Sequence, residues 1–155
     1  MIDHYDWAGG REAMISFGPA TGPVVLAVLP LFEEANRTRT FVSGLLRRLA
    51  DRNIAGALPD LPGQGESLVP SENAMLAGWR TALASAANAA AGERPVHILS
   101  FRGGALLDHG VKAASRWQLA PAKGEALVRN SSAQAQRPAR GSRSTSTITM
   151  TRATR

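Results

Sequence analysis

Short apolar runs alternate with amphipathic stretches along the chain as far as Ser115. Four of these runs have the length and composition of β-strands. They are Glu12–Phe17, Val24–Leu29, Ile54–Leu58 and Val96–Ser100. The second run is dominated by branched side chains, which is typical of a strand that is buried on both faces.

The amphipathic stretches predict helices. The expected helices are Thr40–Arg52, Ser71 to about Ala90, Gly103 to about Ser115, and a short one within Arg116–Arg129. In the first of them, the apolar residues share one face while Arg47 and Arg48 face outward. Ser71 is a suitable N-cap for the second.

This order of elements predicts an α/β fold, in which a parallel sheet of at least three strands is flanked by helices with right-handed crossovers. In such a sheet, the loops at the carboxyl ends of the strands lie along one edge and carry function. The loops that follow Leu29, Leu58 and Leu99 are therefore expected to lie together.

Charge divides the chain near Arg129. All 12 acidic residues and 12 of the 18 basic ones precede it, whereas the last 27 residues carry six arginines and no acid. We therefore expect one domain at residues 1–129 and a disordered basic tail, rich in Ser, Thr and Arg, at residues 130–155. Two further interpretations stay open for the tail: an out-of-frame end, or an arm for nucleic acid or an anionic surface. The tail has no aromatic residue to stack on bases, which disfavours nucleic acid.

The chain contains no cysteine, which excludes disulfides, thiolate metal sites and cysteine catalysis. No apolar run is long enough to span a bilayer, and the acidic first residues do not resemble a signal peptide. These features predict a cytoplasmic protein. No metal-ligand spacing occurs, so neither a metal nor another cofactor is expected.

The first of the three loops, Pro30–Arg39, is crowded with polar residues. Glu33 and Glu34 can favour the dipole at the start of a helix. Together with Asn36 and Arg37 they can also form the rim of a binding site, and the sequence leaves both interpretations open.

The second loop, Pro59–Ser67, predicts a sharp turn. Gly63 and Gly65 permit positive φ angles, and Asp60 is expected to accept hydrogen bonds from backbone amides. A dinucleotide-binding fingerprint fails because Leu68 stands where the third glycine is required. A phosphate-binding P-loop fails because no Gly-Lys-Ser/Thr follows.

The third loop has the strand–turn–helix setting of a nucleophile elbow, a turn in which small residues flank the nucleophile two positions away on either side. Ser100 and Gly104 fill the two small positions, and Arg102 stands at the position of the nucleophile. Arginine stays protonated and cannot attack a carbonyl. Arg102 is expected to pair with Glu33 or Glu34, or to hold an anionic ligand. Ser100 is not expected to be a nucleophile because a strand would bury its hydroxyl.

None of the three histidines, His4, His97 and His109, follows the elbow at the place of a catalytic base. The sequence therefore predicts that no catalytic triad can be assembled from this chain, and that fluorophosphonate probes do not label it.

Two motifs, Asp60–Ser67 and Ser100–Gly104, resemble those of the α/β-hydrolase superfamily. The loop Pro30–Arg39 and the arginine-bearing elbow are similar to the exosortase A system-associated hydrolases of type 2, bacterial proteins found with exopolysaccharide and protein-sorting genes. The resemblance covers roughly residues 10–129. A full α/β hydrolase is longer, and its catalytic acid and histidine follow the elbow. The resemblance thus implies a partial, truncated hydrolase sheet and a pseudoenzyme.

The candidate residues are divided by role. The elbow position is Arg102, the candidate rim residues are Glu33 and Glu34, and the candidate ligand-binding residues are Phe32, Asn36, Arg37, Arg102 and Gly103. The ligand would be a small molecule with an acyl group or another anion. The alternatives are a non-catalytic interaction module and an enzyme that uses Glu33 or Glu34 as a general acid or base. A partial sheet would expose an edge, which favours self-association.

Overall fold

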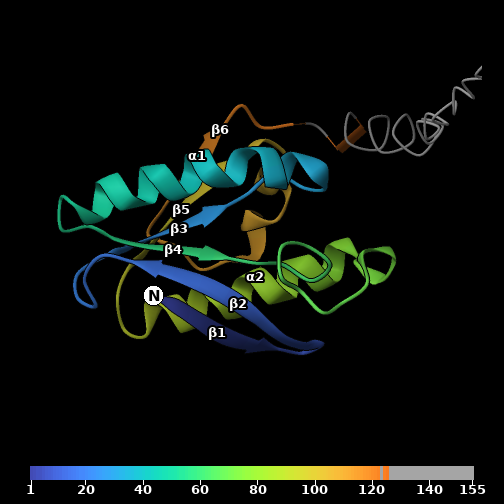
Figure 1. Cartoon of the computed structure of the whole chain (residues 1–155), viewed down its shortest axis with the longest axis horizontal. Coiled ribbons are helices and arrows are strands. Elements are labelled where there is room, and N and C mark those ends of the chain that lie inside the picture. The colour runs from blue at the N-terminus through green and yellow to red at the C-terminus, as the bar shows by residue number, and fades with distance from the viewer. Residues whose placement is uncertain (123, 126–155) are drawn as a thin grey trace, which may run out of the picture.

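The computed structural model describes residues 1–122 and 124–125, which form a six-stranded mixed sheet with the strand order β1-β2-β4-β3-β5-β6 (Figure 1). The strands are β1 Ile2–Trp7, β2 Gly10–Phe17, β3 Val24–Val28, β4 Ala55–Pro59, β5 Val96–Phe101 and β6 Ser115–Leu119. β3, β4, β5 and β6 run parallel, whereas β1 and β2 are antiparallel to their neighbours. The predicted parallel sheet is confirmed, and the loops after β3, β4 and β5 lie at one edge.

Two long helices cover opposite faces of this sheet, α1 Glu33–Ala50 on one face and α2 Leu76–Ala91 on the other (Figure 1). Alternation along β3 supplies both cores: Leu26 packs in the core beneath α2, and Ala27 packs in the core beneath α1. The prediction that this strand is buried on both faces is therefore confirmed. None of the helices among the described residues has the length and hydropathy to cross a bilayer.

The helix boundaries differ from those expected. α1 begins at Glu33 rather than at Thr40, because the polar loop residues continue the helix and its acids occupy the first turn. Ser71 is not the N-cap of the long helix, contrary to the prediction from the sequence. It begins a short 3₁₀ turn, η1 Ser71–Asn73, and the long helix α2 starts at Leu76.

The prediction of a helix from Gly103 to about Ser115 is wrong. Two short 3₁₀ turns, η2 Arg102–Leu106 and η3 Asp108–Gly110, take its place. Glycines disfavour a regular helix here, and the Asp108 side chain is held by hydrogen bonds to the sheet.

Two strands were not predicted. β1 alternates apolar and polar residues and forms a hairpin with β2. β6 occupies residues assigned to a short helix at Arg116–Arg129, and it pairs in parallel with β5. The boundary near Arg129 and the tail at residues 130–155 lie outside the described residues.

Candidate functional site

The turn after β5 has the backbone of a nucleophile elbow. Arg102 adopts a φ of 48°, a left-handed conformation that costs a non-glycine residue about 1–3 kcal/mol. Gly104 passes directly against the end of β3, where a Cβ atom would lie 2.5 Å from the Leu29 carbonyl oxygen. The elbow pattern has a small residue at this position, and the close approach of the β3 end explains why no side chain fits there.

Ser100, at the other small position, is fully buried. Its hydroxyl donates a 2.6 Å hydrogen bond to Oδ2 of buried Asp108, which also accepts from the side-chain amide of Gln118. This arrangement fixes β5, η3 and β6 together. It agrees with the expectation that the Ser100 hydroxyl is buried within the strand.

Arg102 pairs with Glu34 across the sheet edge. Its Nε lies 2.5 Å from Glu34 Oε1, and the two side chains are 48% and 36% exposed. Among the described residues, no other hydrogen bond of this guanidinium is found, and about half of the side chain is exposed. The expected ion pair is present, and Glu34 is the partner.

An open cleft of about 380 Å³ lies between the loop after β3, the loop after β4, and α2. Phe32, Glu33 and Asn36 line one side, and Gln64 and Trp79 line the other. Phe32 is 47% exposed and meets the Trp79 ring edge to face, with 5.5 Å between the ring centroids. The two rings give the cleft an apolar wall.

The structure thus brings three of the candidate residues, Phe32, Glu33 and Asn36, into one cleft. Arg102 does not line this cleft, Arg37 is exposed on α1, and Gly103 is buried in η2. Sequence reasoning missed Gln64 and Trp79 as cleft residues. Trp79 lies on the apolar side of its helix and gave only the signal of a core residue.

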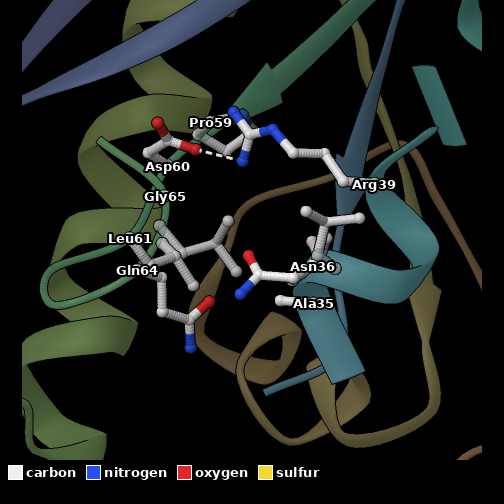
Figure 2. A pocket seen from close by; sticks show the side chains of 11 residues that line it. Ala35, Asn36, Arg39, Pro59, Asp60, Leu61, Gln64 and Gly65 are labelled. Carbon is white, nitrogen blue, oxygen red and sulfur yellow. Dashed lines mark hydrogen bonds and ion pairs between the residues drawn. The ribbon is translucent and has the colours of Figure 1, made fainter. Parts of the chain in front are cut away.

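A smaller cavity of about 10 Å³, roughly the room for one water molecule, lies beside the cleft (Figure 2). Asn36 and Gln64 point toward it from opposite sides, and Arg39 and Asp60 close one end. The Gln64 amide nitrogen is buried and makes no hydrogen bond. This polar recess and the cleft share Ala35, Asn36, Gln64 and Gly65 as lining residues.

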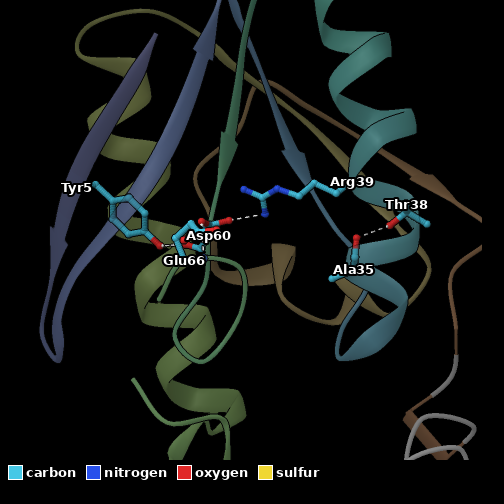
Figure 3. A network of polar contacts seen from close by, with 6 residues as sticks. All are labelled: Tyr5, Ala35, Thr38, Arg39, Asp60 and Glu66. Atoms are coloured by element: carbon cyan, nitrogen blue, oxygen red, sulfur yellow. Dashed lines mark hydrogen bonds and ion pairs between the residues drawn. The ribbon is translucent and has the colours of Figure 1, made fainter. Parts of the chain in front are cut away.

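Asp60 connects three segments that are distant in sequence (Figure 3). Its Oδ1 lies 2.5 Å from Arg39 Nη1 on α1, and its Oδ2 accepts the backbone N–H of Glu66 at 3.1 Å. The Tyr5 hydroxyl donates to the Asp60 carbonyl oxygen at 2.6 Å. The expected bond to a backbone amide is confirmed, whereas the ion pair with Arg39 was not predicted.

A second buried carboxyl, that of Glu12, lies close to this network. Its Oε1 accepts a 3.0 Å hydrogen bond from the Ser67 hydroxyl, whereas its Oε2 makes none. Burial raises the pKa of Glu12, and the nearby Asp60 charge adds to this, while Ser67 and Trp7 act in the opposite direction. Burial, followed by the charges of Glu12 and Asp60, also raises the pKa of Tyr5 above its ordinary value of 10.0.

The raised pKa of Glu12 predicts a dependence of stability on pH. The folded chain keeps this proton to a higher pH than the unfolded chain, so the stabilisation is complete below the ordinary value of 4.5 and is lost as pH rises through the folded pKa. We expect Glu12→Gln to gain stability relative to the parent chain between pH 4.5 and 8. Urea denaturation of both proteins across this range measures the difference. Parallel pH profiles would contradict the expectation.

The described residues contain no group of three or more His, Cys, Asp or Glu that could hold a metal ion. His97 lies within β5 and shares a 2.7 Å hydrogen bond with the Ser115 hydroxyl, and His109 is exposed on η3. Among the described residues, no hydrogen bond joins either histidine to Arg102 or to Glu34.

No family model matches the chain, and no curated protein matches it. Solved structures do. A lidless α/β serine hydrolase from Xanthomonas campestris is 17% identical with a TM-score of 0.66, and the match covers 80% of this chain and 62% of that one. An α/β hydrolase from Sphaerobacter thermophilus is 18% identical with a TM-score of 0.63, covering 86% and 55%. Epoxide hydrolase A from Mycobacterium thermoresistibile is 18% identical with a TM-score of 0.59, covering 76% and 38%.

The chain therefore spans less than two thirds of the length of these hydrolases. The match with these structures is one of overall fold, a mixed sheet with helices on both faces. This chain has the α/β-hydrolase fold.

Proposed function

We propose that this chain binds an anionic small molecule, most simply a carboxylate, at the elbow and does not hydrolyse it. The observation that carries the proposal is the pair of Nη groups of Arg102, which are held at the elbow without a hydrogen-bond partner among the described residues. A guanidinium fork binds a carboxylate through two parallel hydrogen bonds. The same residue has no lone pair with which to attack a carbonyl.

The positions of the three histidines given in this sequence favour binding over hydrolysis. A serine hydrolase needs a histidine hydrogen-bonded to its nucleophile. Of the histidines in this chain, His97 bonds within the sheet, His109 lies on η3 and His4 lies on β1. On this proposal the chain is a pseudoenzyme: it has the fold of a hydrolase, with arginine in place of the nucleophile.

The apolar wall of the cleft favours a ligand with a hydrocarbon part. Phe32 is the exposed ring of the pair, and a hydrocarbon group that covers it gains about 25 cal/mol per Å² of apolar surface removed from water. Phe32 directly precedes α1, whose first turn carries Glu34, the partner of Arg102. On this proposal, the carboxylate head of the ligand binds Arg102 and its hydrocarbon chain extends toward these rings.

We also propose a relationship to the exosortase A system-associated hydrolases of type 2, supported by the loop Pro30–Arg39 and the arginine at the elbow. This relationship would place the protein in the bacterial cytoplasm beside exopolysaccharide synthesis. The absence of cysteine fits a reducing compartment.

The test uses the full chain with sodium octanoate to palmitate and, as uncharged probes, the matching methyl esters. We expect carboxylates to raise the melting temperature of the parent protein, and we expect this shift to disappear in Arg102→Gln. Because the Arg102–Glu34 pair is half exposed, this change should alter the stability of the ligand-free protein by no more than about 1 kcal/mol. Arg48→Gln, on the last turn of α1, is the control and should keep the shift.

The same preparation should not be labelled by a fluorophosphonate probe and should not hydrolyse p-nitrophenyl esters above the buffer rate. Stoichiometric labelling at any serine would overturn the non-catalytic part of the proposal. An equal carboxylate shift in the parent protein and in Arg102→Gln would overturn the binding part.

A further inference from the structure

A second site lies away from the elbow, at the β6 edge of the described sheet. β6 pairs with β5 on one side, and no described element pairs with its other side. Its side chains alternate. Arg116 and Gln118 bond to η3 and to the residue after it, whereas Trp117 and Leu119 lie on the opposite face with exposed fractions of 67% and 55%.

These two exposed side chains continue an apolar strip toward α1. Leu119 lies opposite Phe101 in the β5–β6 register, and the Phe101 ring meets Phe41 of α1 edge to face at 6.4 Å. Phe41 is itself 62% exposed. Contiguous apolar surface of this kind on a soluble protein marks an interaction site.

The chemistry of β6 suits a second copy of itself. In an antiparallel pairing centred on Trp117, Ser115 faces Leu119 and Arg116 faces Gln118, so no like charges meet. Proline and charged side chains protect edge strands from pairing. β6 has no proline, and its one charged side chain, Arg116, is bonded to η3 and the residue after it. The opposite edge, β1, carries Asp3, His4 and Asp6, and two copies of it would bring like charges together.

We propose that two copies of this chain associate through antiparallel pairing of their β6 strands, with the two Trp117 side chains in contact on the two-fold axis. The sheet then continues from one copy into the other, and the two apolar strips join on the α1 face. A whole aromatic side chain buries roughly 150–250 Å², so two Trp117 and two Leu119 contribute several hundred Å². This area is below the roughly 1,000 Å² that a stable specific interface buries, so we expect a weak, transient dimer that forms only at high protein concentration.

Sedimentation velocity of the full chain from about 5 to 500 μM tests the proposal, which does not depend on ligand binding at Arg102. The parent protein should shift from monomer to dimer across this range. Trp117→Glu places two carboxylates face to face and should raise the dissociation constant at least tenfold. Ile2→Glu, at a similarly exposed apolar residue on the opposite edge strand, should dimerise as the parent does.

Because the chain has no cysteine, a single introduced thiol reports on the interface independently. Trp117→Cys should form a disulfide-linked dimer under mild oxidation, and Ile2→Cys should form far less. A parent protein that stays monomeric at 500 μM would overturn the proposal. Weakening of the dimer by Ile2→Glu as strong as that by Trp117→Glu, or equal crosslinking of the two cysteine variants, would also overturn it.

Discussion

Gly104→Ala should destabilise the protein by about 3 kcal/mol or more and lower its melting temperature by at least about 8 °C. The added methyl group would lie 2.5 Å from the Leu29 carbonyl oxygen and 2.8 Å from that of Val28. Both contacts are with the backbone at the end of β3, in its last residue and the residue that follows, and this central strand cannot move without disturbing both cores. Circular dichroism and urea denaturation measure the loss.

Gly110→Ala is the matched control. It also lies in a 3₁₀ turn after the elbow, but a Cβ atom there meets nothing within 4 Å and its φ is not positive. Its stability should stay within about 0.5 kcal/mol of the parent. Equal stability of the two variants would show that the turn after β5 does not pack against β3 as described.

The second large effect is expected at Asp60. Asp60→Ala removes a carboxylate that is 2% exposed and leaves the Arg39 guanidinium, 27% exposed, and the Glu66 amide without their partner. Breaking a buried ion pair from one side costs about 3–5 kcal/mol, and the partial exposure of Arg39 points to the lower end of that range. Chemical denaturation at neutral pH measures the loss.

Asp6→Ala provides the comparison for this change. Asp6 pairs with Arg11 at 3.8 Å, and both side chains are largely exposed, so the pair should contribute less than about 0.5 kcal/mol. If the two aspartate variants lose the same stability, Asp60 is not the buried junction described above.

The central part of the fold could be predicted from the sequence because local patterns encode it. β3, β4 and β5 are apolar runs of strand length, and glycines with positive φ mark the turn after β4. The elbow was recognisable because its small residues are needed for close backbone contact, which leaves a trace at fixed spacing in the sequence.

The remaining elements depend on contacts between distant residues. Nothing local to Ser115–Leu119 distinguishes a strand from a helix; its strand form comes from pairing with β5. The Arg39–Asp60 pair joins α1 to the end of β4 and leaves no spacing signal. Trp79 reads as a core residue because it lies on the apolar side of its helix. Its contact with Phe32 in the cleft wall joins residues 47 positions apart and leaves no signal in the sequence.

The contact between Glu34 and Arg102 also sets which ligands the elbow can select. By holding Nε, the carboxylate fixes the plane of the guanidinium and leaves only the Nη edge for a ligand. It also cancels most of the charge, so the elbow exerts little long-range attraction on anions in general. Selectivity then depends on shape: a planar group with two oxygens matches a preorganised fork, whereas chloride, a sphere of the same charge, does not.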